Sequence, residues 1–69
     1  MKAPPAQVLR EAGRDQHANE TFEKALGRAV RGHQGTFQDY EDLIGKVRAR
    51  AKRDKTRLGD AAKALAAEG

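Results

Sequence analysis

Apolar residues recur along the second half of the chain at alternating steps of three and four residues. This spacing places side chains along one face of a long helix. The stripe consists of Phe37, Tyr40, Ile44, Val47, Ala51, Leu58, Ala61 and Leu65. Asp54 interrupts it at a position where a coiled coil would carry an apolar side chain. A stripe of this kind must be covered, either by the rest of the chain or by a partner.

The long helix is predicted to begin after Thr36, which has an acidic residue three positions later and so resembles a capping box. From there the pattern predicts a helix over 37–58, or over 37–67 if it continues without a break. Gly59 and Asp60 leave both alternatives open, because a glycine can end a helix and an aspartate can cap a further one.

Two shorter helices are predicted before it. One spans 20–31, where Asn19 is a suitable N-cap and Gly32 lies where a glycine typically follows a helix. A short N-terminal helix over 6–12 follows two prolines, which are tolerated in a first helical turn. Because the chain has no alternating pattern of a strand, the sequence predicts an all-α fold.

A short connector around Gln34 would make the two main helices antiparallel. In this hairpin Phe22 lies opposite Val47, and Leu26 lies opposite Leu43 or Ile44. The same arrangement brings acidic residues towards the basic end of the long helix, namely Asp15, Glu20 and Glu23. We therefore expect an antiparallel helical hairpin with a short N-terminal helix, forming a three-helix bundle or a dimer.

The apolar core of such a fold is small. Only 11 of the 69 residues are Phe, Ile, Leu or Val, whereas 13 are alanine. We expect one domain over 1–69 with frayed ends at 1–5 and 67–69, and a stability that benefits from a second copy or another partner. The chain has no cysteine and no apolar run long enough to span a membrane, and its N-terminus does not resemble a signal peptide, so a cytoplasmic location is expected.

The segment from Lys46 to Arg57 is strongly basic. It carries seven cations and one acid, a net charge of +6, while the rest of the chain sums to −2 within a total of +4. The cations are Lys46, Arg48, Arg50, Lys52, Arg53, Lys55 and Arg57. They form two stripes flanking the apolar one, which disfavours a parallel coiled-coil dimer because like charges would face each other. The segment predicts contacts with DNA or RNA phosphates, and the alternatives are a solvated face, an acidic protein or a membrane surface.

Sequence-specific binding by a helix-turn-helix is disfavoured. In that motif the first turns of the second helix face the bases. Here those turns carry Asp39, Glu41 and Asp42, which phosphates would repel.

Nothing in the sequence indicates catalysis or a cofactor. Serine and cysteine are absent, and His17 and His33 lie sixteen residues apart without the spacing of a metal site. We therefore expect a non-enzymatic binding protein, with two hypotheses for its partner. The first is nucleic acid bound through residues 46–57. The second is an acidic or helical protein, for which the chain would be a small subunit, adaptor or inhibitor that binds through Phe37, Tyr40, Ile44, Val47 and Leu58.

Overall fold

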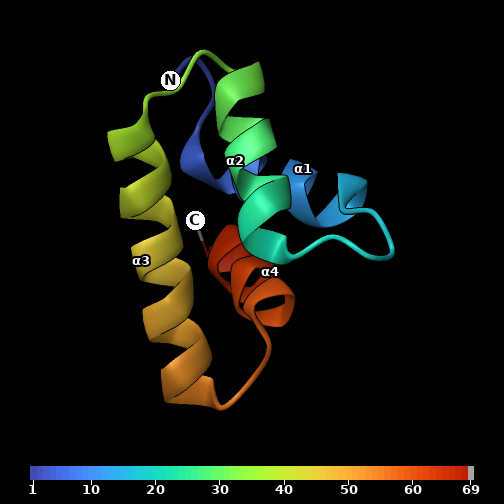
Figure 1. Cartoon of the computed structure of the whole chain (residues 1–69). Coiled ribbons are helices and arrows are strands. Elements are labelled where there is room, and N and C mark those ends of the chain that lie inside the picture. The colour runs from blue at the N-terminus through green and yellow to red at the C-terminus, as the bar shows by residue number, and fades with distance from the viewer. Residues whose placement is uncertain (69) are drawn as a thin grey trace.

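The computed structural model describes residues 1–68, and these form four helices (Figure 1). They are α1 (Pro5–Asp15), α2 (Phe22–Gly32), α3 (Phe37–Asp54) and α4 (Leu58–Glu68). No strand is present in this part of the chain. The all-α fold is therefore confirmed.

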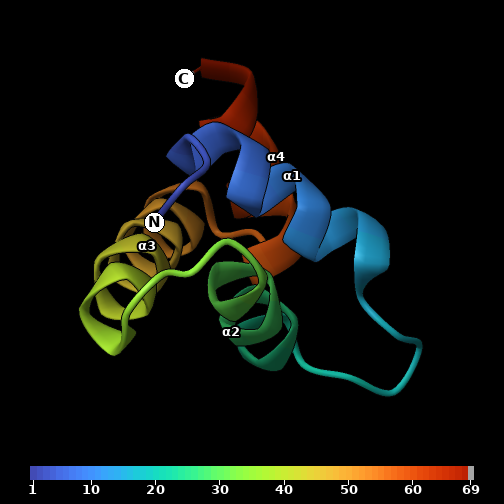
Figure 2. The ribbon, with the colours of Figure 1, turned by 90° about the horizontal axis from the view of Figure 1, so that it is seen from above.

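The helices form a closed ring in which each helix packs against its neighbours in sequence and α1 packs against α4. α2 rises to the connector and α3 descends from it, so the predicted antiparallel hairpin is present (Figure 1). Seen from above, α1 and α4 lie together on one side of this hairpin (Figure 2). They cover its apolar side, and α2 packs more extensively on α1 than on α3.

One hydrophobic core joins the four helices. Its largest fully buried side chains are Leu26, Ile44, Val8, Val30 and Val47. α4 contributes only small buried side chains, which let its backbone approach α1 and α3 closely: Ala61, Ala62 and Ala66. No charged or polar residue among 1–68 is buried, so the core is formed by apolar packing alone.

The predicted long helix is wrong in its extent, since α3 ends at Asp54 and not at residue 58 or 67. Lys55 adopts a left-handed conformation with φ 55°, and the Thr56 N–H donates to the Ala51 carbonyl at 3.0 Å. The break thus lies four residues before Gly59, which is part of α4. This turn lets α4 fold back over the apolar stripe, and the burial of α4 offsets the cost of a left-handed lysine, about 1–2 kcal/mol.

α2 also differs from the prediction at both ends. It begins at Phe22, and its N-cap is Thr21 and not Asn19, because the Thr21 hydroxyl accepts from the Lys24 N–H at 3.2 Å. At the other end the left-handed residue is Gln34, with φ 61°, and not Gly32.

The connector that follows α2 is closed by backbone hydrogen bonds. Gly35 N–H donates to the Val30 carbonyl at 2.8 Å, and Gln34 N–H donates to the Arg31 carbonyl at 3.0 Å. The predicted capping box then starts α3: Asp39 N–H donates to the Thr36 hydroxyl, and the Asp39 carboxylate accepts from the Thr36 N–H at 2.8 Å.

The N-terminal helix is longer than predicted, because α1 runs past Gly13 to Asp15. The residues before it contact the connector, where the Lys2 N–H donates to the His33 carbonyl at 2.8 Å. Segment 1–5 is thus attached to the fold, and α4 extends over residues 67 and 68, while Gly69 lies outside the described residues. Fraying of the two ends stays a prediction.

The close approach at Gly35 predicts opposite effects of two glycine-to-alanine substitutions. A Cβ at Gly35 would overlap the buried Val30 side chain and lie 3.0 Å from the Val30 carbonyl oxygen, so Gly35→Ala should destabilise the fold by about 1–3 kcal/mol. A Cβ at Gly45 meets nothing within 4 Å on the exposed side of α3, so Gly45→Ala should stabilise it by about 0.5–1 kcal/mol. Urea unfolding of both variants checks this, and equal effects of one sign would contradict the packing of the connector.

Candidate nucleic-acid interface

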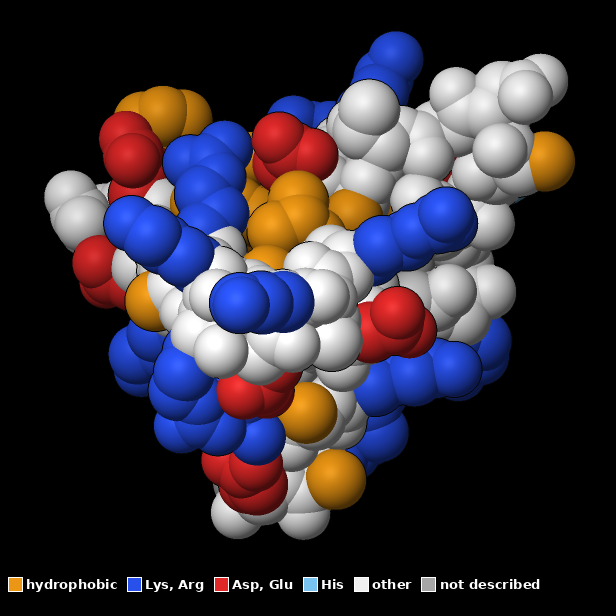
Figure 3. Space-filling model, turned by 90° about the horizontal axis from the view of Figure 1, so that it is seen from below, with side chains coloured by type: hydrophobic (Ala, Val, Ile, Leu, Met, Phe, Trp, Pro, Cys, Tyr) orange, Lys and Arg blue, Asp and Glu red, His pale blue; other side chains and the backbone are white. Residues whose placement is uncertain are grey.

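The basic segment covers the second half of α3 and the turn into α4. Five of its cations lie on α3, while Lys55 and Arg57 lie in the turn. Figure 3, seen from below, shows basic side chains around this end of the molecule with acidic ones between them. All seven residues except Arg50 are exposed.

Arg50 is engaged within the chain. Its Nε donates to Asp54 Oδ2 at 2.6 Å, its Nη1 donates to Glu68 Oε1 at 2.7 Å, and its Nη2 bonds the other Glu68 oxygen. Its side chain is only 13% exposed. These bonds raise the pKa of Arg50 and lower the pKa of both carboxyls. Glu68 lies at the C-terminal end of α4, where the helix dipole disfavours an acid. The bonds from Arg50 offset this repulsion and attach the end of α4 to α3.

Two further cations are partly neutralised. Arg53 Nε lies 3.0 Å from Asp54, and Arg48 Nη2 lies 3.5 Å from Glu23. Both arginine side chains remain more than half exposed, and ion pairs at such positions are weak. They can exchange a carboxylate for a phosphate at little cost.

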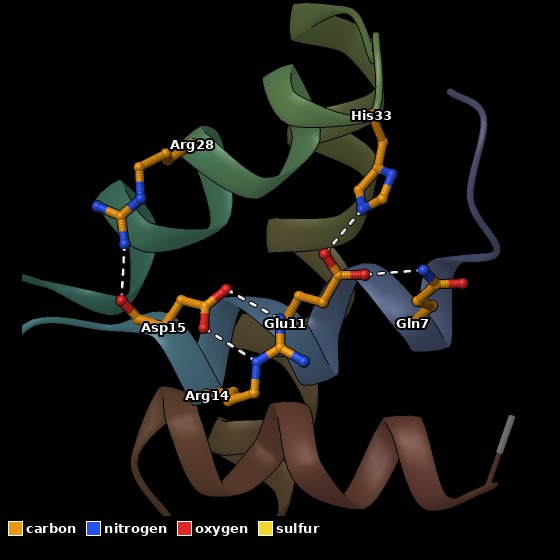
Figure 4. Close-up of polar contacts among 6 residues, drawn as sticks. All are labelled: Gln7, Glu11, Arg14, Asp15, Arg28 and His33. Carbon is orange, nitrogen blue, oxygen red and sulfur yellow. Dashed lines mark hydrogen bonds and ion pairs between the residues drawn. The ribbon is translucent and has the colours of Figure 1, made fainter.

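Only one of the three acids expected beside the basic segment, Glu23, reaches it. Glu20 binds Arg28 instead, and the Asp15 carbonyl accepts from Arg28 Nη2 at 2.8 Å (Figure 4). The Asp15 carboxylate binds Arg14 at 3.0 Å, which lowers the pKa of Asp15. These acids therefore neutralise less of the basic segment than the hairpin predicted.

Four cations of the segment have no carboxylate within 4.0 Å among residues 1–68. They are Lys46, Lys52, Lys55 and Arg57. On α3, Lys46 and Arg53 lie on one flank of the exposed face and Arg48 and Lys52 on the other, at 100° per residue. The small residues Gly45 and Ala49 lie between the flanks and are exposed, so the charged groups border a surface without bulky side chains.

The first half of α3 has the opposite charge. Asp39, Glu41 and Asp42 lie in its first two turns, where the helix dipole favours acids. The charge of α3 therefore changes sign along its length, from acidic in its first turns to basic in its second half.

The predicted partner interface is mostly enclosed by the chain itself. Ile44 and Val47 are 1% and 0% exposed, so they are not available to a partner. Tyr40 and Leu58 are partly buried against the core. Phe37 alone of the five is exposed, at 74%. Leu58 is part of α4, and the folding back of this helix, which the sequence pattern did not predict, helps to cover Ile44 and Val47.

The two histidines serve local structure. His33 Nε2 lies 2.9 Å from Glu11 Oε1, and Gln7 donates to the other Glu11 oxygen at 2.8 Å (Figure 4). The hydrogen bond with His33 lowers the pKa of Glu11 and ties α1 to the end of α2. His17 uses its backbone N–H to donate to Glu20 Oε1 at 3.1 Å. Among residues 1–68 no group of three or more side chains is placed to hold a metal ion.

Comparisons with protein families, with curated proteins and with solved structures find no match to this chain. None of the helices described is long and apolar enough to cross a membrane.

The ion pairs of Arg50 with Asp54 and Glu68, called the Arg50 clamp below, predict how the stability of the fold changes in acid. The hydrogen bonds with Arg50 hold the pKa of Glu68 in the folded chain below its ordinary 4.5. As the pH falls, the unfolded chain therefore binds a proton at Glu68 before the folded chain does. The stabilisation by the Arg50–Glu68 ion pair is thus complete above pH 4.5 and is lost as the pH falls through the lowered pKa. Glu68→Gln should lower the melting temperature at neutral pH and flatten its decline as the pH falls below about 5.

The matched background is Arg50→Met, in which the clamp is already removed. There Glu68→Gln should have little further effect, as a double-mutant cycle measures. An equal effect of Glu68→Gln in both backgrounds would show that Glu68 acts without Arg50.

Proposed function

We propose that this chain is a non-enzymatic nucleic-acid-binding protein that contacts the phosphate backbone through the second half of α3 and the turn into α4. The observation that carries the proposal is the group of four exposed cations that have no acidic partner among residues 1–68: Lys46, Lys52, Lys55 and Arg57. Arg48 and Arg53 add to the surface when their weak ion pairs open. Arg50 is left out because Asp54 and Glu68 hold it.

The surface favours a double helix over a single strand. Single-strand binding uses exposed aromatic rings on which bases stack. Phe22 is buried, and Phe37 and Tyr40 lie at the opposite, acidic end of α3. The basic surface thus offers charge without stacking, which suits backbone contacts that carry little sequence information.

Binding should depend steeply on salt. Neutralising four phosphates of duplex DNA gives a slope of about −3.6 for log K against log salt, so affinity should fall on the order of 100-fold between about 50 and 200 mM salt. Fluorescence anisotropy with a labelled random duplex measures this. An affinity that does not change with salt would contradict the proposal.

Lys52→Gln should weaken duplex binding and reduce the salt slope by about one. Lys2→Gln is the matched control, because it removes the same charge beside the connector, at the other end of the molecule. Equal losses from both variants would indicate attraction by net charge alone and no defined surface.

Lys55→Gly separates binding from folding. It removes a cation but places glycine at a left-handed position, so the variant should be more stable by about 1 kcal/mol. We expect a higher melting temperature together with weaker duplex binding. Unchanged binding in this stabilised variant would exclude the turn from the interface.

A further inference from the structure

A second surface lies at the other end of α3, where its first turns face α2. Phe37 is 74% exposed, and its ring stacks on Tyr40 with the centroids 6.0 Å apart. The two rings line a groove of about 390 Å³ that also includes Gly27, Val30 and Gly35. A large aromatic side chain exposed beside an apolar groove is typical of a protein interface.

Gly27 sets the depth and the register of this groove. A Cβ at Gly27 would lie 3.9 Å from the Tyr40 ring, so these two residues lie at the same level of the antiparallel pair. Lys24 lies three residues from Gly27 and Glu41 one residue from Tyr40, each towards the basic end of the hairpin. At a rise of 1.5 Å per residue, the positions of Lys24 and Glu41 along the helix axes differ by only about 3 Å.

Exposed side chains of opposite charge flank the groove on its two rims. On the α2 rim, Lys24 and Arg31 are exposed and lie two turns apart on one face. On the α3 side, Glu41 is not one of the residues that line the groove, but it is exposed one turn after Phe37 and so lies on the same face of α3. None of the three forms an ion pair within the described part of the chain. Glu23 also lines the groove, but it is paired with Arg48.

We propose that this groove binds a second copy of the chain through a two-fold axis parallel to the groove. Such an axis places the α2 rim of each copy against the α3 rim of the other, so that both positive rims meet negative rims. Lys24 of one copy then faces Glu41 of the other, and this contact occurs twice. The two Phe37 rings cover the apolar floor between them.

This symmetry distinguishes a second copy from other partners, since a groove with one positive and one negative rim is complementary to itself. The small core gives the association a physical benefit, because burying an exposed phenylalanine adds apolar contact that the single chain lacks. The inference does not depend on nucleic-acid binding, which uses the opposite end of α3.

Sedimentation equilibrium from micromolar to millimolar protein tests the proposal. The unaltered chain should show a monomer–dimer equilibrium, and Phe37→Ser should shift it to monomer with an unchanged circular dichroism spectrum, since this side chain is mostly exposed. A chain that stays monomeric at every concentration would overturn the proposal, as would a dimer that tolerates Phe37→Ser.

Charge exchange tests the symmetry itself. Lys24→Glu or Glu41→Lys alone should weaken the dimer at least about tenfold, because each creates two like-charge contacts. Mixing the two single variants should restore association as a heterodimer, in which both contacts are attractive again. Lys63→Glu on α4, on the opposite side of the hairpin, is the control and should leave the dimer unchanged. Failure of the mixture to associate would reject this geometry.

Discussion

The left-handed turn at Lys55 is the feature on which the rest of the structure depends. It ends α3 at Asp54 and sends α4 back along the apolar stripe. Without the reversal, Ile44 and Val47 would lack the cover that α4 helps to give, and a chain with 11 large apolar residues would need a partner to bury them. With it, small alanines of α4 close the core within one chain. A locally unfavourable backbone conformation is thus stabilised by packing elsewhere.

The closed core decides which groups remain for function. Since most of the apolar stripe is buried within the chain, the two surfaces of α3 that remain for binding are the cations at its end and the aromatic groove at its start. The charge of α3 changes sign between these two surfaces. We infer that the helix keeps them separate, with polyanion contact at one end and self-association at the other. Arg50 belongs to neither, because it stabilises the return of α4.

Features set by residues close together in the sequence were predictable, and the return of α4 was not. The capping box at Thr36 and the antiparallel hairpin follow from residue types within a few positions. The end of α3 does not, because Gly59 is the better local signal and only tertiary packing favours the break at Lys55. For the same reason the sequence showed Arg50 within a basic stripe but not that Glu68 would reach it. The i,i+4 spacing of Arg50 and Asp54 was the one available sign.

Amide hydrogen exchange in dilute solution tests the central claim most directly, namely that α4 covers α3 within a single chain. The amides of Ala62, Leu65 and Ala66 should be protected to a similar degree as those of Ile44 and Val47, because all belong to one cooperative core. Exchange of the α4 amides at the rate of an unstructured peptide, with α1 to α3 still protected, would contradict the account.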